Sequence, residues 1–387
     1  MTVKMMERYP VVKGGRVRGF VRTLLDFIEV GEPYKYYLWL GERGVEVERD
    51  NALLRALYEP GMGLTGYAVG DYEDYVDTLV EALGEKLRGK TVMVNFSGGK
   101  DSVTTLYLLS ELREKVDFRL YAVYIYMPHL EPPGSMSFAE ETAVKLGVDF
   151  LCVEADRKRV EFYLSREGLP RRGRRWCTYL KIMALRKTKK ELRADFEAKG
   201  DRVVEAGKRL RKLIHFLRRR AFLDGAKVNV VYPLTILDVA HIVRGLNLVH
   251  PHYLAGIPRV SCKYCPYKSL YELYASEEFE VEDEGFVEHV ARREHYRIYS
   301  PKMSWEEYWG QHAWRFDPTV AELLAKLRKE LEGGAELRGE DVREMFRSIW
   351  VEELPRLKVL GIEGIEAKVK DVPWIRRDYS SRRGATV

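Results

Sequence analysis

The sequence has no long uncharged apolar run. Nowhere do about 18 such residues follow one another, which is the length that a membrane-spanning helix requires. The first 20 residues, MTVKMMERYPVVKGGRVRGF, also lack the apolar core of a secretory signal peptide. We therefore expect a cytoplasmic protein that has no membrane as a partner.

Amide side chains are also scarce. The 387 residues include one Gln and four Asn, whereas 32% are charged. Few thermolabile amides together with abundant Glu, Lys and Arg are typical of hyperthermophile proteins, so the composition predicts a thermophilic protein. Hydrophobic residues make up 46%, which is enough for a large core and excludes disorder of the whole chain.

Cysteine is limited to Cys152, Cys177, Cys262 and Cys265. The last two form a Cys-x-x-Cys pair, which in a cytosolic chain indicates metal binding or redox chemistry first. A disulfide stays open as an alternative, because intracellular proteins of hyperthermophiles do contain disulfides. Cys152 lies inside the apolar run FLCVEA, a position typical of a buried and inert thiol.

The net charge of +6 is distributed unevenly. Residues 171–220 contain 19 Lys or Arg and 5 Asp or Glu, a net charge of +14, so the other 337 residues together carry −8. A segment this basic predicts binding of a polyanion such as tRNA or another nucleic acid. One alternative is a solvated surface helix over KTKKELRADFEAKGDRVVEAGKRLRK, in which Lys187 and Glu191 would pair. Another is a field that only steers a nucleotide to its site.

Apolar periodicity predicts an α/β fold. Helical patterns alternate with patterns of buried strands, and the strands are expected at 91–96, 118–127, 148–155 and 228–234. The helical patterns cover 72–88, 103–115, 137–147 and 237–248. This alternation is typical of a doubly wound, Rossmann-like parallel sheet.

The domain boundaries follow from the same pattern. We expect an N-terminal accessory region at 1–88 with a small α+β element, and a nucleotide-binding catalytic domain at 89–275. The basic residues 171–220 would form an insert in that domain, and 276–387 would form a helical C-terminal region.

One loop has the composition of a phosphate cradle. It lies between a predicted strand and a predicted helix and consists of Ser97, Gly98, Gly99, Lys100, Asp101 and Ser102. Two glycines let backbone N–H groups converge on an anion, and the helix N-terminus adds partial positive charge. Lys100 supplies a full charge, and Asp101 could hold a Mg²⁺ ion that bridges phosphate oxygens. The alternative is a capped glycine turn that binds nothing.

SGGKDS resembles the signature of the PP-loop ATP pyrophosphatase superfamily, also called the adenine nucleotide alpha hydrolases. Two later segments are similar to its phosphoadenosine phosphosulfate reductase-like branch. RRWCTYLKIMAL (174–185) resembles a Cys-x3-Lys motif, and VVYPLTILDVAHIVRGLNLVHPHYLAGIPRVSCKYCPY (230–267) resembles a Pro-Leu to Cys-x-x-Cys-Pro sequence. The resemblance covers roughly residues 90–270.

The resemblance implies that the loop grips the phosphates of ATP, with Lys100 and Asp101 in catalytic roles. Adenine would lie against the second strand near Tyr124, and Lys181 and Arg259 match basic positions that face nucleotide or substrate. Cys177 matches one cysteine motif of the iron–sulfur adenylylsulfate reductases, and Cys262 and Cys265 match their Cys-x-x-Cys pair. In those reductases the two motifs together hold a [4Fe-4S] cluster.

The three cysteines are compatible with several roles. Three thiolates would leave one iron free to bind sulfide or substrate, as in some tRNA-thiolating members of the superfamily. The same thiols could instead hold zinc, form a structural or disulfide pair, or have no role at all. In the iron–sulfur reductases the motif that matches Cys177 is a Cys-Cys pair. In this chain Trp176 replaces the first cysteine of that pair.

Reductase activity is in doubt because motifs are missing. Sulfonucleotide reductases carry a nucleophilic Cys near the C-terminus, and this chain has no Cys after Cys265. The family's Gly-x-Arg-x-Glu-Ser motif is replaced by GKRLRKLIH (207–215), and its Asp-Thr-Gly segment by MPHLEPPG (127–134).

Three functions are therefore considered. The first is an ATP-dependent sulfurtransferase that adenylates a tRNA or other nucleic acid, releases pyrophosphate, and replaces AMP with sulfur carried by the cysteines, with Cys177 catalytic. The second is a sulfonucleotide reductase that uses an external thiol from a thioredoxin-like protein. The third is a nucleotide-binding scaffold without turnover.

Overall fold

The structure is a computed structural model. It describes residues 72–326 with their side chains, except 206 and 207, and residues 339–354 and 361–372, except 345 and 371. For the strands before residue 72, and for 327–330, 336–338 and 358–359, it describes the backbone.

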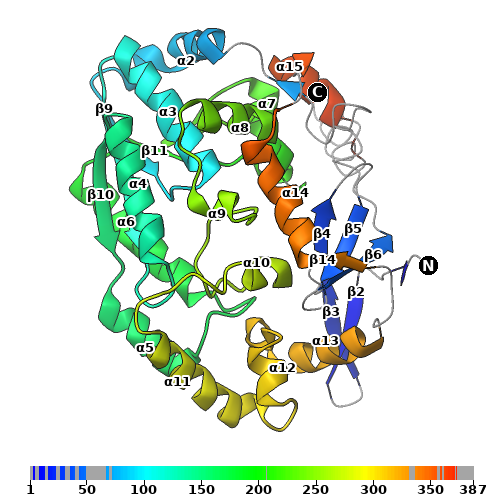
Figure 1. The fold of residues 1–387 in the computed structure, drawn as a ribbon. Helices are drawn as coiled ribbons and strands as arrows, with labels where there is room; N and C mark the ends of the chain where they lie inside the picture. The colour runs from blue at the N-terminus through cyan, green and yellow to red at the C-terminus, as the bar shows by residue number, and fades with distance from the viewer. Residues whose placement is uncertain are drawn as a thin grey trace, which may run out of the picture.

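A six-stranded sheet with the order β10-β9-β8-β11-β13-β12 forms the centre of the molecule (Figure 1). Only β12 runs antiparallel to its neighbour, and the other pairs are parallel. The strands are β8 Thr91–Asn95, β9 Arg119–Tyr126, β10 Asp149–Glu154, β11 Phe196–Ala198, β12 Leu223–Asp224 and β13 Lys227–Val228. The predicted doubly wound α/β fold is confirmed.

The strand order places a topological switch point between β8 and β11. From β8 the chain builds outward through β9 to the edge strand β10, and it then returns to the other side of β8 to form β11. The loops that follow β8 and β11 therefore diverge at the carboxyl end of the sheet, where open α/β sheets bind their ligands.

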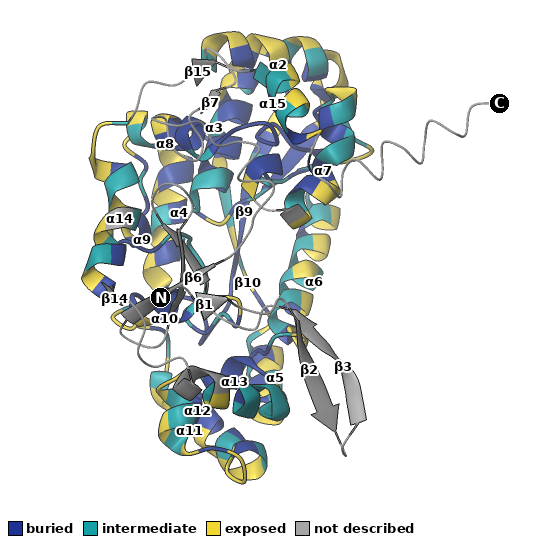
Figure 2. Ribbon diagram, turned by 90° about the vertical axis from the view of Figure 1, so that its right-hand side faces the viewer, coloured by how far each residue is buried: buried dark blue, intermediate teal, exposed yellow. Residues whose placement is uncertain are grey.

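Helices cover both faces of the sheet. Side chains alternate along β8, so that Val92 and Val94 belong to one hydrophobic core and Met93 to another. The same alternation assigns Ala122 to the first core and Val123 to the second. Figure 2 shows the strands between α4 on one side and α6 on the other. Burial on two faces explains why these strands are continuous apolar runs in the sequence.

Four helices lie close to their predicted positions, namely α2 Tyr72–Leu87, α3 Lys100–Lys115, α4 Pro133–Lys145 and α8 Ile236–Gly245. The other helices up to residue 274 are α5 Arg157–Glu167, α6 Trp176–Glu191, α7 Gly207–Arg219, α9 Pro251–Leu254 and α10 Leu270–Tyr274. A short 3-10 helix, η1, spans Val203–Glu205. Two helices begin earlier than predicted, α3 directly after Gly99 and α4 at Pro133.

Two predictions about local structure were wrong. The strand expected at 228–234 is limited to β13, because Asn229 donates its side-chain amide to the carbonyl of Asp201 and accepts from the N–H of Val231. The rest of that run is a buried loop. The continuous surface helix considered for the basic segment is interrupted by β11 and η1, so part of this segment lies in the central sheet.

The C-terminal region is helical, as predicted, and contributes strands to small sheets. Its elements are α11 Glu284–Glu294, the π-helical turn η2 His295–Tyr299, α12 Trp305–Trp309, η3 Ala313–Arg315, α13 Pro318–Glu330, β14 Glu336–Arg338, α14 Gly339–Val351, β15 Lys358–Val359 and α15 Gly361–Val369. β14 pairs with β6 and β15 pairs with β7.

The N-terminal region contributes strands. They are β1 Val3–Lys4, β2 Arg8–Lys13, β3 Arg16–Arg22, β4 Phe27–Val30, β5 Lys35–Trp39, β6 Arg43–Glu48 and β7 Tyr67–Ala68. The helix predicted for its α+β element lies outside the described residues. Among the residues that the structure describes, no helix is long and apolar enough to cross a membrane.

Candidate active site at the switch point

The loop Ser97–Ser102 connects β8 to α3 at the switch point. Gly98 has φ of +69°, a left-handed conformation that favours glycine. The Ser102 hydroxyl donates to the carbonyl of Gly99 at 2.8 Å and lies 3.2 Å from the Ser97 hydroxyl, which closes the loop on itself. The loop therefore has the strand-to-helix conformation that the sequence predicts.

Asp101 and Arg202 join the two sides of the switch point. Arg202 follows β11, is 4% exposed, and its Nε lies 2.5 Å from Asp101 Oδ1. Lys100 Nζ lies 3.2 Å from the other carboxylate oxygen. Burial tends to raise the pKa of Asp101, but the charges of Arg202 and Lys100 outweigh burial, and the pKa is lowered. Asp101 is therefore ionised and already engaged by two cations.

Gly200 allows the loop after β11 to contact the phosphate loop. A Cβ atom at this position would lie 2.7 Å from the carbonyl oxygen of Asp101 and 3.1 Å from Thr105 Oγ1. Any larger residue would push these two segments apart. The close approach explains the glycine at this position.

Helix α7 adds a second group of cations across from the phosphate loop. Lys212 Nζ lies 2.6 Å from Asp201 Oδ2, and Arg209 Nη1 lies 2.9 Å from Asp201 Oδ1. Arg209 also pairs with Glu205 at 3.4 Å. Asp201 thus orients two cations of α7 toward the loop that follows β8.

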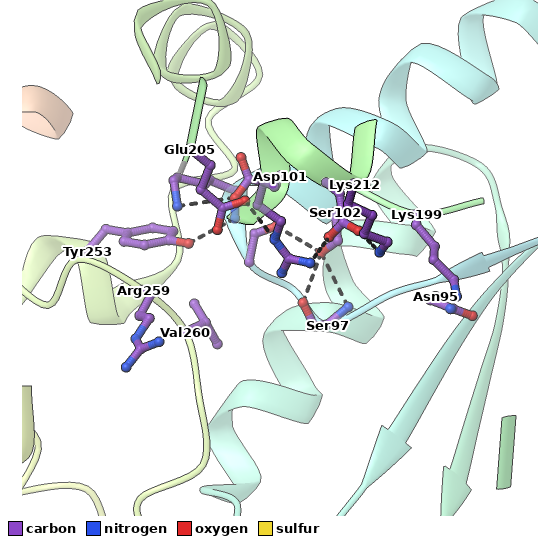
Figure 3. A pocket seen from close by; sticks show the side chains of 15 residues that line it. Asn95, Ser97, Asp101, Ser102, Lys199, Glu205, Lys212, Tyr253, Arg259 and Val260 are labelled. Carbon is purple, nitrogen blue, oxygen red and sulfur yellow. Dashed lines mark hydrogen bonds and ion pairs between the residues drawn. The ribbon is translucent and has the colours of Figure 1, made fainter. Parts of the chain in front are cut away.

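These side chains line one pocket of about 500 Å³ (Figure 3). They come from the end of β8, the phosphate loop, the segment after β11, α7 and the segment 253–260. The lining residues are Asn95, Ser97, Gly99, Lys100, Asp101, Ser102, Lys199, Gly200, Asp201, Glu205, Arg209, Lys212, Tyr253, Arg259 and Val260. Cationic side chains outnumber carboxylates in this list, so the pocket suits a polyphosphate.

Tyr253 and Arg259 line the pocket from the segment 253–260. The Tyr253 hydroxyl accepts a hydrogen bond from the backbone N–H of Lys100 at 2.9 Å, so it occupies a donor at the N-terminus of α3. Arg259 forms an ion pair with Glu272, and the negative charge of Glu272 raises the pKa of Arg259 against the effect of burial. Arg259 therefore remains a cation at the pocket wall.

The three predicted thiols influence one another electrostatically and do not line this pocket. Burial raises the pKa of Cys262, the charge of Lys181 opposes the rise, and Cys265 and Cys177 add to it. Burial and Cys265 likewise raise the pKa of Cys177. The thiols of α6 and of the Cys262–Cys265 turn therefore influence one another across 85 residues of sequence.

Lys181 and Tyr124 belong to the surroundings of the thiols. Lys181 Nζ donates to Glu131 Oε2 at 3.2 Å, and the charges of Cys262 and Glu131 raise its pKa. Tyr124 is buried on β9, and burial and Glu131 raise the pKa of its hydroxyl. Neither residue lines the phosphate pocket.

The prediction that Cys152 is buried was wrong. Cys152 is exposed and contacts Met136, with 3.4 Å between the sulfur atoms. The reason is the position of β10 at the edge of the sheet, where few elements cover it. Cys152 is therefore more exposed than Cys177, Cys262 and Cys265, which we call the thiol trio.

All four cysteines are free thiols. Within the described parts of the chain, no group of three or more His, Cys, Asp and Glu side chains is placed to hold a metal ion. The trio nevertheless provides the soft sulfur donors that zinc and iron–sulfur clusters use, and its thiols are close enough to affect one another electrostatically. The chemical type of these donors therefore fits zinc or an iron–sulfur cluster. The three sulfur atoms would have to move closer together to bind it.

Several site residues were not found from the sequence. Lys199, Asp201, Arg202, Arg209 and Lys212 all lie in the segment treated as a basic insert. The sequence feature that marks this part of the site is a short apolar pattern before Lys199, and Gly200 follows it. Charged residues around it concealed a strand of only three residues.

The phosphate loop thus lies at the switch point of a doubly wound sheet, the arrangement that the resemblance to PP-loop proteins implies. The family model for the phosphoadenosine phosphosulfate reductase domain matches residues 91–268. The chain therefore contains a phosphoadenosine phosphosulfate reductase-like domain of the PP-loop superfamily.

Curated relatives match different shares of the chain. The tRNA-cytidine(32) 2-sulfurtransferase of Psychromonas ingrahamii is 32% identical over 139 residues, which is 35% of this chain and 40% of the relative. The enzyme of the same name from Ralstonia pickettii is 33% identical over 144 residues, 35% of this chain and 39% of the relative. The chain thus spans about 40% of the length of these relatives. An uncharacterized protein of Methanocaldococcus jannaschii is 26% identical over 283 residues, 70% of this chain and 51% of that protein.

Similar solved structures include a tRNA thiolase and an NAD synthetase. The U34-tRNA thiolase NcsA from Methanococcus maripaludis with its [4Fe-4S] cluster has a TM-score of 0.37 and 15% identity, covering 73% of this chain and 90% of that one. The NH3-dependent NAD synthetase from Campylobacter jejuni has a TM-score of 0.33 and 14% identity, covering 61% and 98%.

Proposed function

We propose that this protein is an ATP-dependent sulfurtransferase that acts on tRNA. The observation that carries the proposal is the position of the free thiol trio next to a cationic phosphate pocket, with Arg259 lining the pocket and within electrostatic reach of Cys265. The similarity to tRNA-cytidine(32) 2-sulfurtransferases supports tRNA as the substrate. A cytoplasmic location fits this substrate.

In the first step, ATP binds with its phosphates between the loop Ser97–Ser102 and α7. An oxygen of the target base attacks the α-phosphorus, the bond to the bridging oxygen breaks, and pyrophosphate leaves. Lys100, Arg209 and Lys212 stabilise the negative charge that develops on the pyrophosphate. The base is then joined to AMP through its oxygen.

Mg²⁺ would enter this site with ATP. The carboxylates of Asp101, Asp201 and Glu205 are each paired with an Arg or a Lys in the structure. They supply the hard oxygen atoms that Mg²⁺ prefers, and the ion would neutralise the phosphate charge. Because Asp101 is paired with Arg202 and Lys100 in the structure, it also positions these two cations.

In the second step, sulfur replaces the activated oxygen. The terminal sulfur of a persulfide on one cysteine of the trio attacks the base carbon, and AMP leaves with the oxygen. A second thiol of the trio then attacks the sulfur–sulfur bond, which releases the thiolated base and leaves a disulfide between the two cysteines. An external dithiol reduces that disulfide, and a sulfur donor reloads the persulfide. Cys177 is the proposed catalytic member.

The same thiols, Cys177, Cys262 and Cys265, are the residues that would hold a [4Fe-4S] cluster, with zinc as the alternative. A cluster with one iron free of protein ligands would bind and activate sulfide. Lys181 and Arg175 lower the pKa of nearby thiols and would favour the thiolate form that ligation needs.

The test is release of AMP and pyrophosphate from ATP, measured with and without added tRNA. We expect both products only with tRNA, and loss of both in Lys100→Ala. Iron and acid-labile sulfide are measured in anaerobically purified protein and in the Cys177→Ser variant. Bound zinc or a disulfide in place of iron would remove the sulfur-carrier role from these thiols.

A sulfonucleotide reductase is the second candidate, because the matching family model is that of the reductase domain. It would need the thiol of a thioredoxin-like protein, since no Cys follows Cys265. Release of sulfite from a sulfonucleotide with thioredoxin, and no effect of tRNA, would favour it. If Lys100→Ala changed neither nucleotide binding nor any turnover, a nucleotide-binding scaffold would be the remaining interpretation.

A further inference from the structure

Tyr267 is an exposed aromatic residue next to the thiol trio. It follows Cys265 by two residues and is 43% exposed. The guanidinium of Arg175 lies 4.8 Å from the centre of its ring, and that of Arg172 lies 5.6 Å from it. A ring that is nearly half exposed contributes little to the core, so packing alone does not account for it.

Arg175 is held in place by a neutral partner. Its Nε and Nη2 donate to the Thr178 hydroxyl at 2.8 and 2.5 Å. The hydroxyl fixes the plane of the guanidinium without neutralising its charge. Arg175 is the N-cap residue of α6, and Cys177 lies in the first turn of that helix.

The backbone of Tyr267 is tied to the phosphate pocket. Arg259, which lines the pocket, donates to the carbonyl of Tyr267 and pairs with Glu272 through the same guanidinium. Tyr267 is therefore connected to the ATP pocket through Arg259 and to the thiols through Cys265. A molecule seated on the ring would be close to both.

Helix α6 also carries large apolar side chains that are exposed. Tyr179 is 52% exposed and Ile182 is 41% exposed, on the helix that also carries Cys177. α6 belongs to the segment of net charge +14. Exposed rings inside a strongly basic surface are typical of sites that bind single-stranded nucleic acid.

We propose that Tyr267 and Arg175 form a stacking platform for an unpaired base of the RNA substrate, which they position next to the thiol trio. This proposal rests on the proposed function. Bases stack on tyrosine rings and on guanidinium planes only where they are not already stacked in a duplex. The platform therefore selects a loop or another single-stranded segment of RNA.

The test compares Tyr267→Ala, Tyr267→Phe and Tyr296→Ala in the full chain. Tyr296 is 82% exposed and serves as a matched control for removal of a surface tyrosine. Binding is measured by fluorescence anisotropy with a labelled unstructured RNA oligonucleotide and with a blunt duplex of the same sequence. We expect Tyr267→Ala to weaken binding of the single strand about 10-fold, and Tyr267→Phe and Tyr296→Ala to bind like the wild type.

ATP binding is measured in the same variants. It should not change in Tyr267→Ala, because Arg259 contacts the backbone carbonyl of Tyr267, which the substitution keeps. Equal binding of the single strand by Tyr267→Ala and the wild type would overturn the proposal. So would equal loss of duplex and single-strand binding.

Failure of this proposal is distinguishable from failure of the proposed function. If tRNA-dependent release of AMP has the same KM for tRNA in Tyr267→Ala and in the wild type, the platform is wrong and the function stands. If Tyr267→Ala weakens single-strand binding but no tRNA releases AMP, the platform stands and the sulfurtransferase function is wrong.

Discussion

Arg202 Nε lies 2.5 Å from Asp101 Oδ1, and this buried ion pair joins the loop after β8 to the segment after β11. The two residues are 101 positions apart in the sequence. Because β8 and β11 are neighbours in the sheet, the pair spans the switch point and sets the shape of the phosphate pocket.

Replacing Arg202 with Met should destabilise the protein. Asp101 would keep only Lys100 as a partner, and breaking one side of a buried pair costs about 2–4 kcal/mol of unfolding free energy. Urea unfolding measures the loss. The double variant Asp101→Asn with Arg202→Met should not recover it, because Lys100 then loses its carboxylate partner. An unchanged midpoint in Arg202→Met would contradict the structural role of the pair.

Replacing Gly200 with Ala should separate the two loops. The new Cβ would lie 2.7 Å from the carbonyl oxygen of Asp101, a contact that forces the backbone to move. We expect a loss of about 1–3 kcal/mol and weaker ATP binding. Gly245 in α8 is the matched control, since nothing lies within 4 Å of a Cβ there. Gly245→Ala should leave ATP binding unchanged, and equal effects of the two substitutions would contradict the close approach.

Lys212 should contribute to ATP binding without being needed for folding. Its side chain lines the pocket and pairs with Asp201, whereas the exposed Lys208 on the same helix does not line it. We expect Lys212→Met to weaken ATP binding about 5- to 10-fold, which isothermal titration calorimetry measures. Lys208→Met should bind ATP like the wild type. If the two variants bind equally, α7 takes no part in the site.

Two buried histidines should make the protein sensitive to acid. Burial lowers the pKa of His250 to about 4 and that of His252 to about 2, so both are neutral in the folded protein. As the pH falls below about 6.5, the unfolded chain binds protons at these residues and the folded chain does not. Stability should therefore fall from pH 6.5 toward pH 4, by up to about 1.4 kcal/mol per pH unit for each histidine.

Unfolding free energies measured across this range test the assignment. His250→Gln and His252→Gln should each flatten the dependence on pH, even if their stability at pH 7 is lower. The exposed His241 is the control, and His241→Gln should keep the wild-type slope. An unchanged slope in both variants of the buried residues would show that these histidines are protonated in the folded state.

The phosphate loop could be recognised before the structure was known because its chemistry is local. Six consecutive residues, Ser97–Ser102, specify the turn, the donors and the helix start. The strands β8 and β9 were also predicted, since burial on both faces leaves continuous apolar runs, and so was the edge strand β10. The boundaries of the three proposed domains stay predictions.

β11 and the cations around it could not be recognised in this way. A strand of three residues is too short for a periodic pattern, and its neighbours are charged for reasons that only the fold explains. Asp201 pairs with Lys212 and Arg209 of α7, so residues that suggested a solvated surface helix line the pocket. Lys181 and Tyr124 had been predicted at the nucleotide and lie near the thiols.

By itself, the sequence predicted the phosphate loop, the parallel sheet that carries it, and the thiols that accompany it. Only the tertiary structure decided which cations line the pocket and which thiols influence one another. The physical reason is that a motif acts through neighbours in the chain, whereas a site depends on side chains that the strand order brings together. The pairing of β8 with β11 places Arg202 on Asp101, and no local pattern in the sequence contains that contact.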